Sequence, residues 1–126
     1  MKIGFTKMKI LFVFIVFLFF SCQKDEKSGY FELGKNEIEM NYQETQCSDP
    51  WYELVILHQD RSKKAILKEY LDLKKIKYLD MVYDKASSDE VISCTACTCF
   101  TGSVFYIKIK DKSDNIEKLK EIGFKL

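Results

Sequence analysis

An unbroken run of eleven apolar residues, residues 10–20, is the feature that most restricts what this chain can fold into. A helix that crosses a bilayer needs about 20 such residues, whereas a run of 10–14 suits the hydrophobic part of an export signal. Lysines precede the run, as in the basic first segment of a signal peptide, and a small residue and a cysteine, Ser21 and Cys22, follow it. We therefore expect residues 1–21 to be a signal peptide that is removed.

The segment that ends in Cys22 resembles the signal of bacterial lipoproteins, whose cysteine is lipidated and becomes the first residue of the mature protein. That signal usually reads leucine, two small residues and cysteine. This chain has Phe19-Phe20-Ser21-Cys22, so only the last two positions follow the pattern. The resemblance implies several acyl chains such as palmitate on Cys22, and each buried methylene stabilises membrane attachment by about 0.8 kcal/mol. It implies a protein anchored by lipid outside the cytoplasm.

The charged residues after Cys22 bear on which membrane holds the protein. Lys24, Asp25 and Glu26 are similar to the lysine-plus-acid run that sends lipoproteins of some Gram-negative bacteria to the cell surface. The resemblance implies an outer-membrane protein that faces the outside, with a periplasm-facing position as the alternative. A plainer interpretation is a polar tether, and residues 22–29 as a whole read as the lipidated cysteine and a polar linker.

The rest of the chain, residues 30–126, has the length of one domain with an ordinary hydrophobic core. Residues 1–21 contain three lysines and no acid, so their removal lowers the net charge from +1 to −2. Nucleic-acid binding calls for a basic patch or stripe, and we expect no nucleic-acid partner. The expected partners are the membrane, through the lipid, and a protein or a small molecule.

Apolar periodicity predicts five elements in this domain. Alternation predicts strands over residues 38–43, 77–83 and 103–110, and helical spacing predicts helices over 62–75 and 115–122. Residues 51–57 fit either a buried strand or the start of a helix. The alternation of the first strand fails at Glu44, where we expect the strand to end or to bulge.

The order strand, helix, strand, strand, helix predicts an α+β domain. Its sheet has three to four strands, two helices cover one face, and the arrangement is ferredoxin-like in part. Both faces of the last strand are apolar, because Val104 and Tyr106 alternate with the core residues, so this strand is placed centrally. Ser62 is a predicted helix N-cap, Asp114 starts a capping-box-like sequence, and Gly123 is a predicted C-cap.

Four further cysteines, Cys47, Cys94, Cys97 and Cys99, carry the chemistry of the domain. An even number of cysteines outside the cytoplasm favours disulfides, and four cysteines allow three connectivities. A bridge from Cys47 to any of the others closes a loop of roughly 50 residues and contributes about 4 kcal/mol in the chain-entropy treatment. Our preferred pairs are Cys94 with Cys97 and Cys47 with Cys99.

Two other functions are open for the same four cysteines. As thiolates they could bind zinc or copper, although paired C-x-x-C knuckles are the more usual zinc spacing. As a thiol oxidoreductase the chain would need its C-x-x-C at a helix N-terminus, but Cys99 leads into a predicted strand. The mature chain contains no phosphate loop or hydrolase motif. We therefore assign no catalytic residue and no cofactor, and expect a non-enzymatic binding or accessory module.

Overall fold

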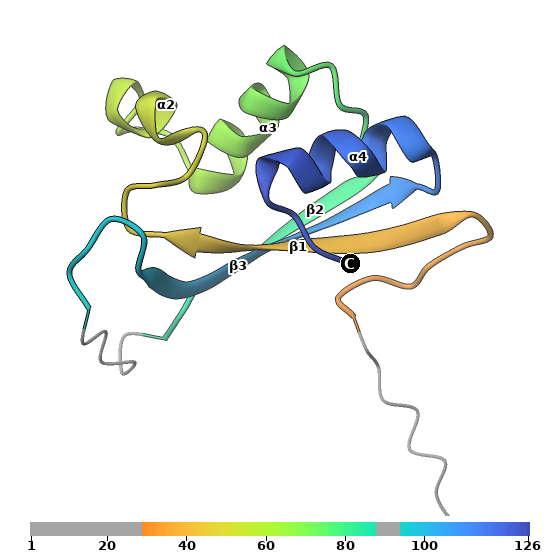
Figure 1. Ribbon diagram of the computed structural model, residues 1–126, viewed down its shortest axis with the longest axis horizontal. Helices are drawn as coiled ribbons and strands as arrows, with labels where there is room; N and C mark the ends of the chain where they lie inside the picture. The colour runs from red at the N-terminus through yellow and green to blue at the C-terminus, as the bar shows by residue number, and fades with distance from the viewer. Residues whose placement is uncertain (1–28, 88–93) are drawn as a thin grey trace, which may run out of the picture.

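The computed structural model describes residues 29–87 and 94–126, which form a small α+β domain (Figure 1). Its elements in chain order are β1 (Glu37–Thr45), α2 (Tyr52–Leu57), α3 (Lys63–Leu73), β2 (Asp80–Asp84), β3 (Phe100–Lys110) and α4 (Ser113–Ile122). The three strands form one antiparallel sheet, and the helices lie on one side of it (Figure 1). The α+β class is confirmed. The expected pair of helices is corrected to three, because residues 52–57, which sequence alone left ambiguous, form α2.

The predicted signal peptide, residues 1–21, and the predicted lipidation site, Cys22, lie outside the described residues. So do the residues expected to direct export, which are Lys24, Asp25 and Glu26. Of the helices that the structure does describe, none combines the length and the apolar character needed to cross a bilayer.

β3 is the central strand, as its two apolar faces predict. Ile107 lies opposite Met40 of β1 on one side and opposite Met81 of β2 on the other. Because both outer strands are antiparallel to β3, β1 and β2 run parallel to each other, and the chain between them crosses over through α2 and α3. The remaining edge of β1 is partly covered, since Asn41 and Lys125 exchange two backbone hydrogen bonds of 2.8 Å.

The hydrophobic core lies between the sheet and the helices. Every second residue of β1 and β3 points into it, as the period of a strand requires. Its largest fully buried side chains are Trp51, Phe105, Met40, Ile66, Leu67, Leu71, Met81, Ile107, Ile109 and Leu119. Trp51 packs edge-on against the Phe105 ring, with 5.6 Å between centroids. The indole therefore joins the helix layer to the central strand.

The start of α3 confirms the predicted cap. Ser62 has extended backbone angles, and its hydroxyl accepts a 3.1 Å hydrogen bond from the Ala65 N–H. We expect Ser62→Ala to lower the free energy of unfolding by about 1 kcal/mol, because it leaves an N–H of the first turn without this acceptor. Urea unfolding followed by circular dichroism measures the change. Ser113→Ala is the matched control, since no side chain caps α4, and an equal loss in both variants would contradict the assignment.

The sequence predicted the end of α4 correctly but not its N-terminal cap. The helix begins at Ser113, with Lys112 at the N-cap position and no side-chain cap, so the capping role expected of Asp114 is wrong. Asp114 lies in the first turn, where its charge interacts favourably with the helix dipole. Gly123 does end the helix, in the left-handed conformation with φ of 115°. A Cβ at that position would lie 3.0 Å from the Tyr42 ring, which is a second reason for glycine.

Candidate functional site

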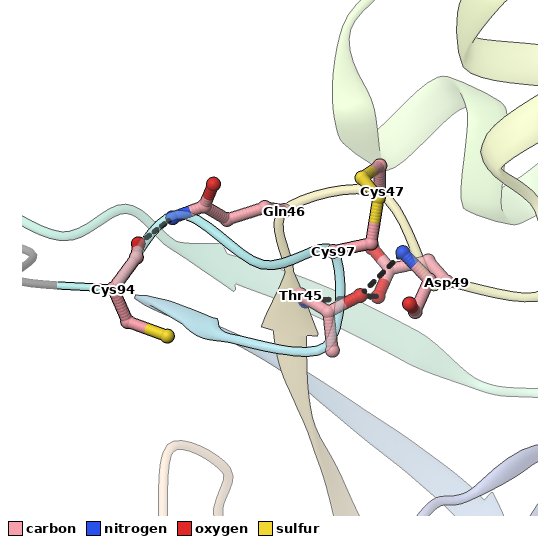
Figure 2. The surroundings of a disulfide bond; sticks show 7 residues. Thr45, Gln46, Cys47, Asp49, Cys94 and Cys97 are labelled. Atoms are coloured by element: carbon pink, nitrogen blue, oxygen red, sulfur yellow. Dashed lines mark hydrogen bonds between the residues drawn. A yellow bond between two sulfur atoms is a disulfide. The ribbon is translucent and has the colours of Figure 1, made fainter.

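The four cysteines of the domain meet at one end of the sheet, where β1 ends and β3 begins. Figure 2 labels Cys47, Cys94 and Cys97 at this end. Three hydrogen bonds hold the two segments side by side. The Cys47 N–H donates to the Cys97 carbonyl at 3.2 Å, and the Gln46 N–H donates to the Cys99 carbonyl at 2.9 Å. The Gln46 side-chain amide donates to the Cys94 carbonyl at 2.6 Å. The cysteine segment thus continues the pairing of β1 and β3 beyond the strands.

The disulfides join Cys47 to Cys97 and Cys94 to Cys99. Disulfides as such are confirmed, and so is a closed loop of 50 residues from Cys47, but the preferred partners are corrected. The backbone pairing explains the difference, because it sets Cys97 directly across from Cys47, with 4.5 Å between Cα atoms. A turn closed by the Cys99 N–H and the Ala96 carbonyl then brings Cys94 within 5.9 Å of Cys99, measured between Cα atoms.

This connectivity bears on the two alternative functions. A thioredoxin-like exchange requires a disulfide between the two cysteines of the C-x-x-C sequence. Here Cys94 and Cys97 are bonded to other cysteines instead. They precede β3 and not a helix. Thiolate binding of zinc or copper would require both disulfides to be reduced. Within residues 29–87 and 94–126, no group of three or more His, Cys, Asp or Glu side chains is arranged to hold a metal ion.

β3 contains a bulge close to the disulfides, just after Cys99 in the chain. Between the pairs Gln43–Val104 and Thr45–Phe100, β1 has one residue, Glu44, and β3 has three, at positions 101–103. Gly102 occupies the middle of these three with φ of 86°, a conformation that glycine adopts without strain. The sequence predicted that the first strand would end or bulge at Glu44. The strand instead continues through Glu44 to Thr45, and the extra residues of the bulge belong to β3.

Glu44 is a carboxylate at a core position. It is 3 % exposed, and its Oε2 accepts hydrogen bonds of 2.9 Å from the hydroxyls of Tyr83 and Thr101. The Lys63 ammonium lies 2.9 Å from Oε1, which has no other polar partner in the described part of the chain. One side chain therefore ties together β1, β2, the β3 bulge and the first turn of α3.

Asp49 is the second buried acid at this end of the molecule. Its Oδ1 accepts hydrogen bonds from the Tyr42 hydroxyl at 3.1 Å, the Thr45 N–H at 2.9 Å and the Thr45 hydroxyl at 2.7 Å. Burial raises the pKa of the Asp49 carboxyl above its usual value, with a further contribution from the Glu44 charge, against the opposing effect of these donors. Burial, together with the Asp49 carboxylate, also raises the pKa of Tyr42. Asp49 fixes the turn that carries Cys47 (Figure 2).

The half-buried Tyr83 hydroxyl makes the stability of the fold depend on pH in the alkaline range. Burial is the main cause that raises the pKa of Tyr83 from 10.0 to about 12. The unfolded chain therefore loses this proton first, so the contribution of Tyr83 is complete below pH 10 and is lost as the pH rises towards about 12. We expect the free energy of unfolding in urea to fall across this range, and to fall less steeply in Tyr83→Phe. Identical slopes in the two proteins would contradict this account.

The sequence had no means of assigning Glu44 and Asp49 to one buried polar cluster with Lys63 and Tyr83. The only signal was the failed alternation at Glu44, and charged residues in a strand are usually solvent-facing. The effect of the polar cluster and the two disulfides is structural. They hold the exposed cysteine segment, residues 94–98, against the end of the sheet.

No family model matches this chain, and comparisons with curated proteins and with solved structures also find no match.

Proposed function

We propose that this protein is a small lipoprotein, anchored through Cys22 outside the cytoplasm, whose domain is a binding or accessory module stapled by disulfides. The observation that carries the proposal is the pairing of all four later cysteines in two disulfides. Disulfides persist in the oxidising compartments outside the cytoplasm. Because the four cysteines pair with one another, none of them is left as a partner for Cys22. This agrees with a separate role for Cys22, and lipidation is the role that its sequence surroundings imply.

The binding role is supported by the way the cysteine segment is presented. Cys97 and its neighbours are exposed, and Phe100 at the start of β3 is an exposed aromatic residue, 56 % accessible. Binding loops are commonly exposed segments carried by a rigid scaffold. Here the scaffold is the sheet end with its disulfides and the buried Glu44.

The test is the intact mass of the natural protein purified from membranes, with and without thiol alkylation. We expect a chain that begins at Cys22, carries acyl groups, and gains no alkyl group until a reductant is added. Cys22→Ser should remain unprocessed and unacylated, while its domain keeps the two disulfides. Alkylation of Cys94, Cys97 and Cys99 without reductant would contradict the disulfide module and favour the thiolate metal site. An unacylated wild-type protein would contradict the anchor.

The direction of export has its own test. We propose that Lys24, Asp25 and Glu26 send the protein to the outer surface of the outer membrane. Protease treatment of intact cells should cleave the wild-type domain, as seen by electrophoresis after reduction, and spare a variant with all three residues changed to alanine. Lys27→Ala, just beyond the run, is the control and should remain accessible. Protection of the wild-type protein would favour the periplasm-facing alternative.

We also infer a partly ferredoxin-like arrangement of the sheet. It is supported by β1 and β2, which lie parallel on either side of β3 and are joined through helices. Because this fold supports many unrelated activities, no part of the proposed function depends on it.

A further inference from the structure

A shallow groove of about 710 Å³ lies beside β1, next to the sheet face that is turned away from the helices. The groove is bordered by three exposed apolar side chains, which are Tyr30 (49 % accessible), Leu33 (48 %) and Leu126 (71 %). Tyr106 of β3 forms part of its wall. Apolar side chains that gather on one face can form a surface that contacts another molecule or a membrane.

The chain that leads to Cys22 is fixed at this groove. The Glu39 carboxylate accepts hydrogen bonds from the backbone N–H of Tyr30 at 2.8 Å and of Phe31 at 3.0 Å. The Tyr30 ring packs on the Tyr106 ring with 4.3 Å between centroids. Gly29 lies so close to Glu39 that a Cβ would come within 2.9 Å of Oε2. In Figure 1 this segment, drawn in orange, runs on the side of the sheet opposite the helices.

The length of chain before this point limits how far the domain can be from an anchor. Six residues lie between Cys22 and Gly29. An extended chain spans at most about 3.6 Å per residue, so these seven steps cover at most about 25 Å. A small domain is about 30 Å across. A tether of this length keeps Gly29, and the groove beside it, within about 25 Å of whatever holds Cys22, so the groove can reach that surface.

We propose that this face rests on the lipid surface, with Tyr30, Leu33 and Leu126 placed in the headgroup and upper acyl region. The inference depends on the proposed lipid anchor at Cys22. Tyrosine is enriched at membrane–water interfaces, and peripheral proteins bury apolar side chains into this boundary. The anchor holds the face at a high effective concentration near the bilayer, so three side chains are sufficient to orient the domain. The disulfide end of the sheet then remains accessible to a partner.

The test uses the natural lipidated protein in vesicles of phosphatidylethanolamine and phosphatidylglycerol that contain brominated phosphatidylcholine, a quencher of indole fluorescence. Leu33→Trp introduces an indole at the groove. Leu57→Trp introduces one at a 72 % exposed position of α2, on the helix side, as the matched control. Trp51 is buried and common to both variants. We expect several-fold stronger quenching of the indole introduced by Leu33→Trp, and equal quenching of the two would overturn the proposal.

A third variant tests the role of the fixed segment. Glu39→Ala removes the acceptor of both N–H groups, so the segment at Tyr30 is no longer held to the sheet. Combined with Leu33→Trp, it should reduce the quenching towards that of Leu57→Trp. Unchanged quenching would show that the segment does not orient the domain and would contradict the proposal.

Failure of the anchor is distinguished from failure of this proposal by vesicle flotation. A wild-type protein that does not float with vesicles contradicts lipidation at Cys22. In that case a histidine tag in place of residues 1–21, bound to a chelating lipid, supplies the tether, and the same comparison of Leu33→Trp with Leu57→Trp still decides which face contacts lipid.

Discussion

Replacing both Cys47 and Cys97 with alanine should lower the free energy of unfolding by about 4 kcal/mol. The bridge closes a sequence separation of 50 residues, and constraint of the unfolded chain grows with the logarithm of the loop length. Because small domains have a net stability of only about 5–15 kcal/mol, the variant should be close to unfolding at 37 °C. Urea unfolding at 25 °C, followed by circular dichroism, measures the change.

The second disulfide provides the matched control for this prediction. Cys94 and Cys99 are only five positions apart in the sequence. The free energy of unfolding of the double alanine variant at these positions should therefore fall by about 2 kcal/mol. Both double variants remove two sulfur atoms from the same end of the sheet. A larger loss from Cys94 and Cys99 than from Cys47 and Cys97 would contradict the loop-length explanation.

Glu44→Ala should lower the free energy of unfolding by about 3 kcal/mol. The change leaves the half-buried hydroxyls of Tyr83 and Thr101 without their acceptor, and each then costs towards the lower end of the about 1–3 kcal/mol of an unsatisfied buried group. Breaking a fully buried ion pair costs about 3–5 kcal/mol. Lys63 is 36 % exposed and its ammonium can turn to water, so losing its ion pair with Glu44 costs less than this. The measurement is again urea unfolding at neutral pH.

Glu44→Gln separates charge from hydrogen bonding at the same position. Its amide oxygen keeps an acceptor for Tyr83 or Thr101 but loses the attraction to Lys63, so we expect a loss intermediate between wild type and Glu44→Ala. Gln43→Ala, at the exposed neighbouring position of β1, should change stability by less than about 0.5 kcal/mol. Equal stability of Glu44→Ala and Gln43→Ala would show that the buried network does not stabilise the fold.

Sequence periodicity predicted the strands and the two long helices well, because their apolar residues recur at the spacing that burial on one face requires. Val104 and Tyr106 also placed β3 at the centre of the sheet. Residues 52–57 could not be assigned from periodicity, since a short apolar run fits a strand and a helix equally. The helix predicted to start at residue 115 starts at Ser113, a shift of two residues that is usual at a helix end.

The site was only partly predictable, for a reason that concerns distance along the chain. The sequence indicated that Cys47 pairs with a cysteine of the later cluster, but the choice of Cys97 depends on the backbone hydrogen bond between these two residues. Register between segments 50 residues apart is set by the tertiary structure and not by local spacing. The contacts of Glu44 with Lys63 and Tyr83 could not be predicted from the sequence for the same reason.

The Cys47–Cys97 bridge has a further consequence for how the domain responds to proteolytic cleavage. It closes α2, α3 and β2 into one covalent ring. A single backbone cut between these two cysteines opens the ring but releases no fragment, so β1 and β3 remain joined through sulfur. Such a nicked molecule would migrate as one chain until a reductant is added. Proteolysis inside the ring is then a modification that the domain can survive.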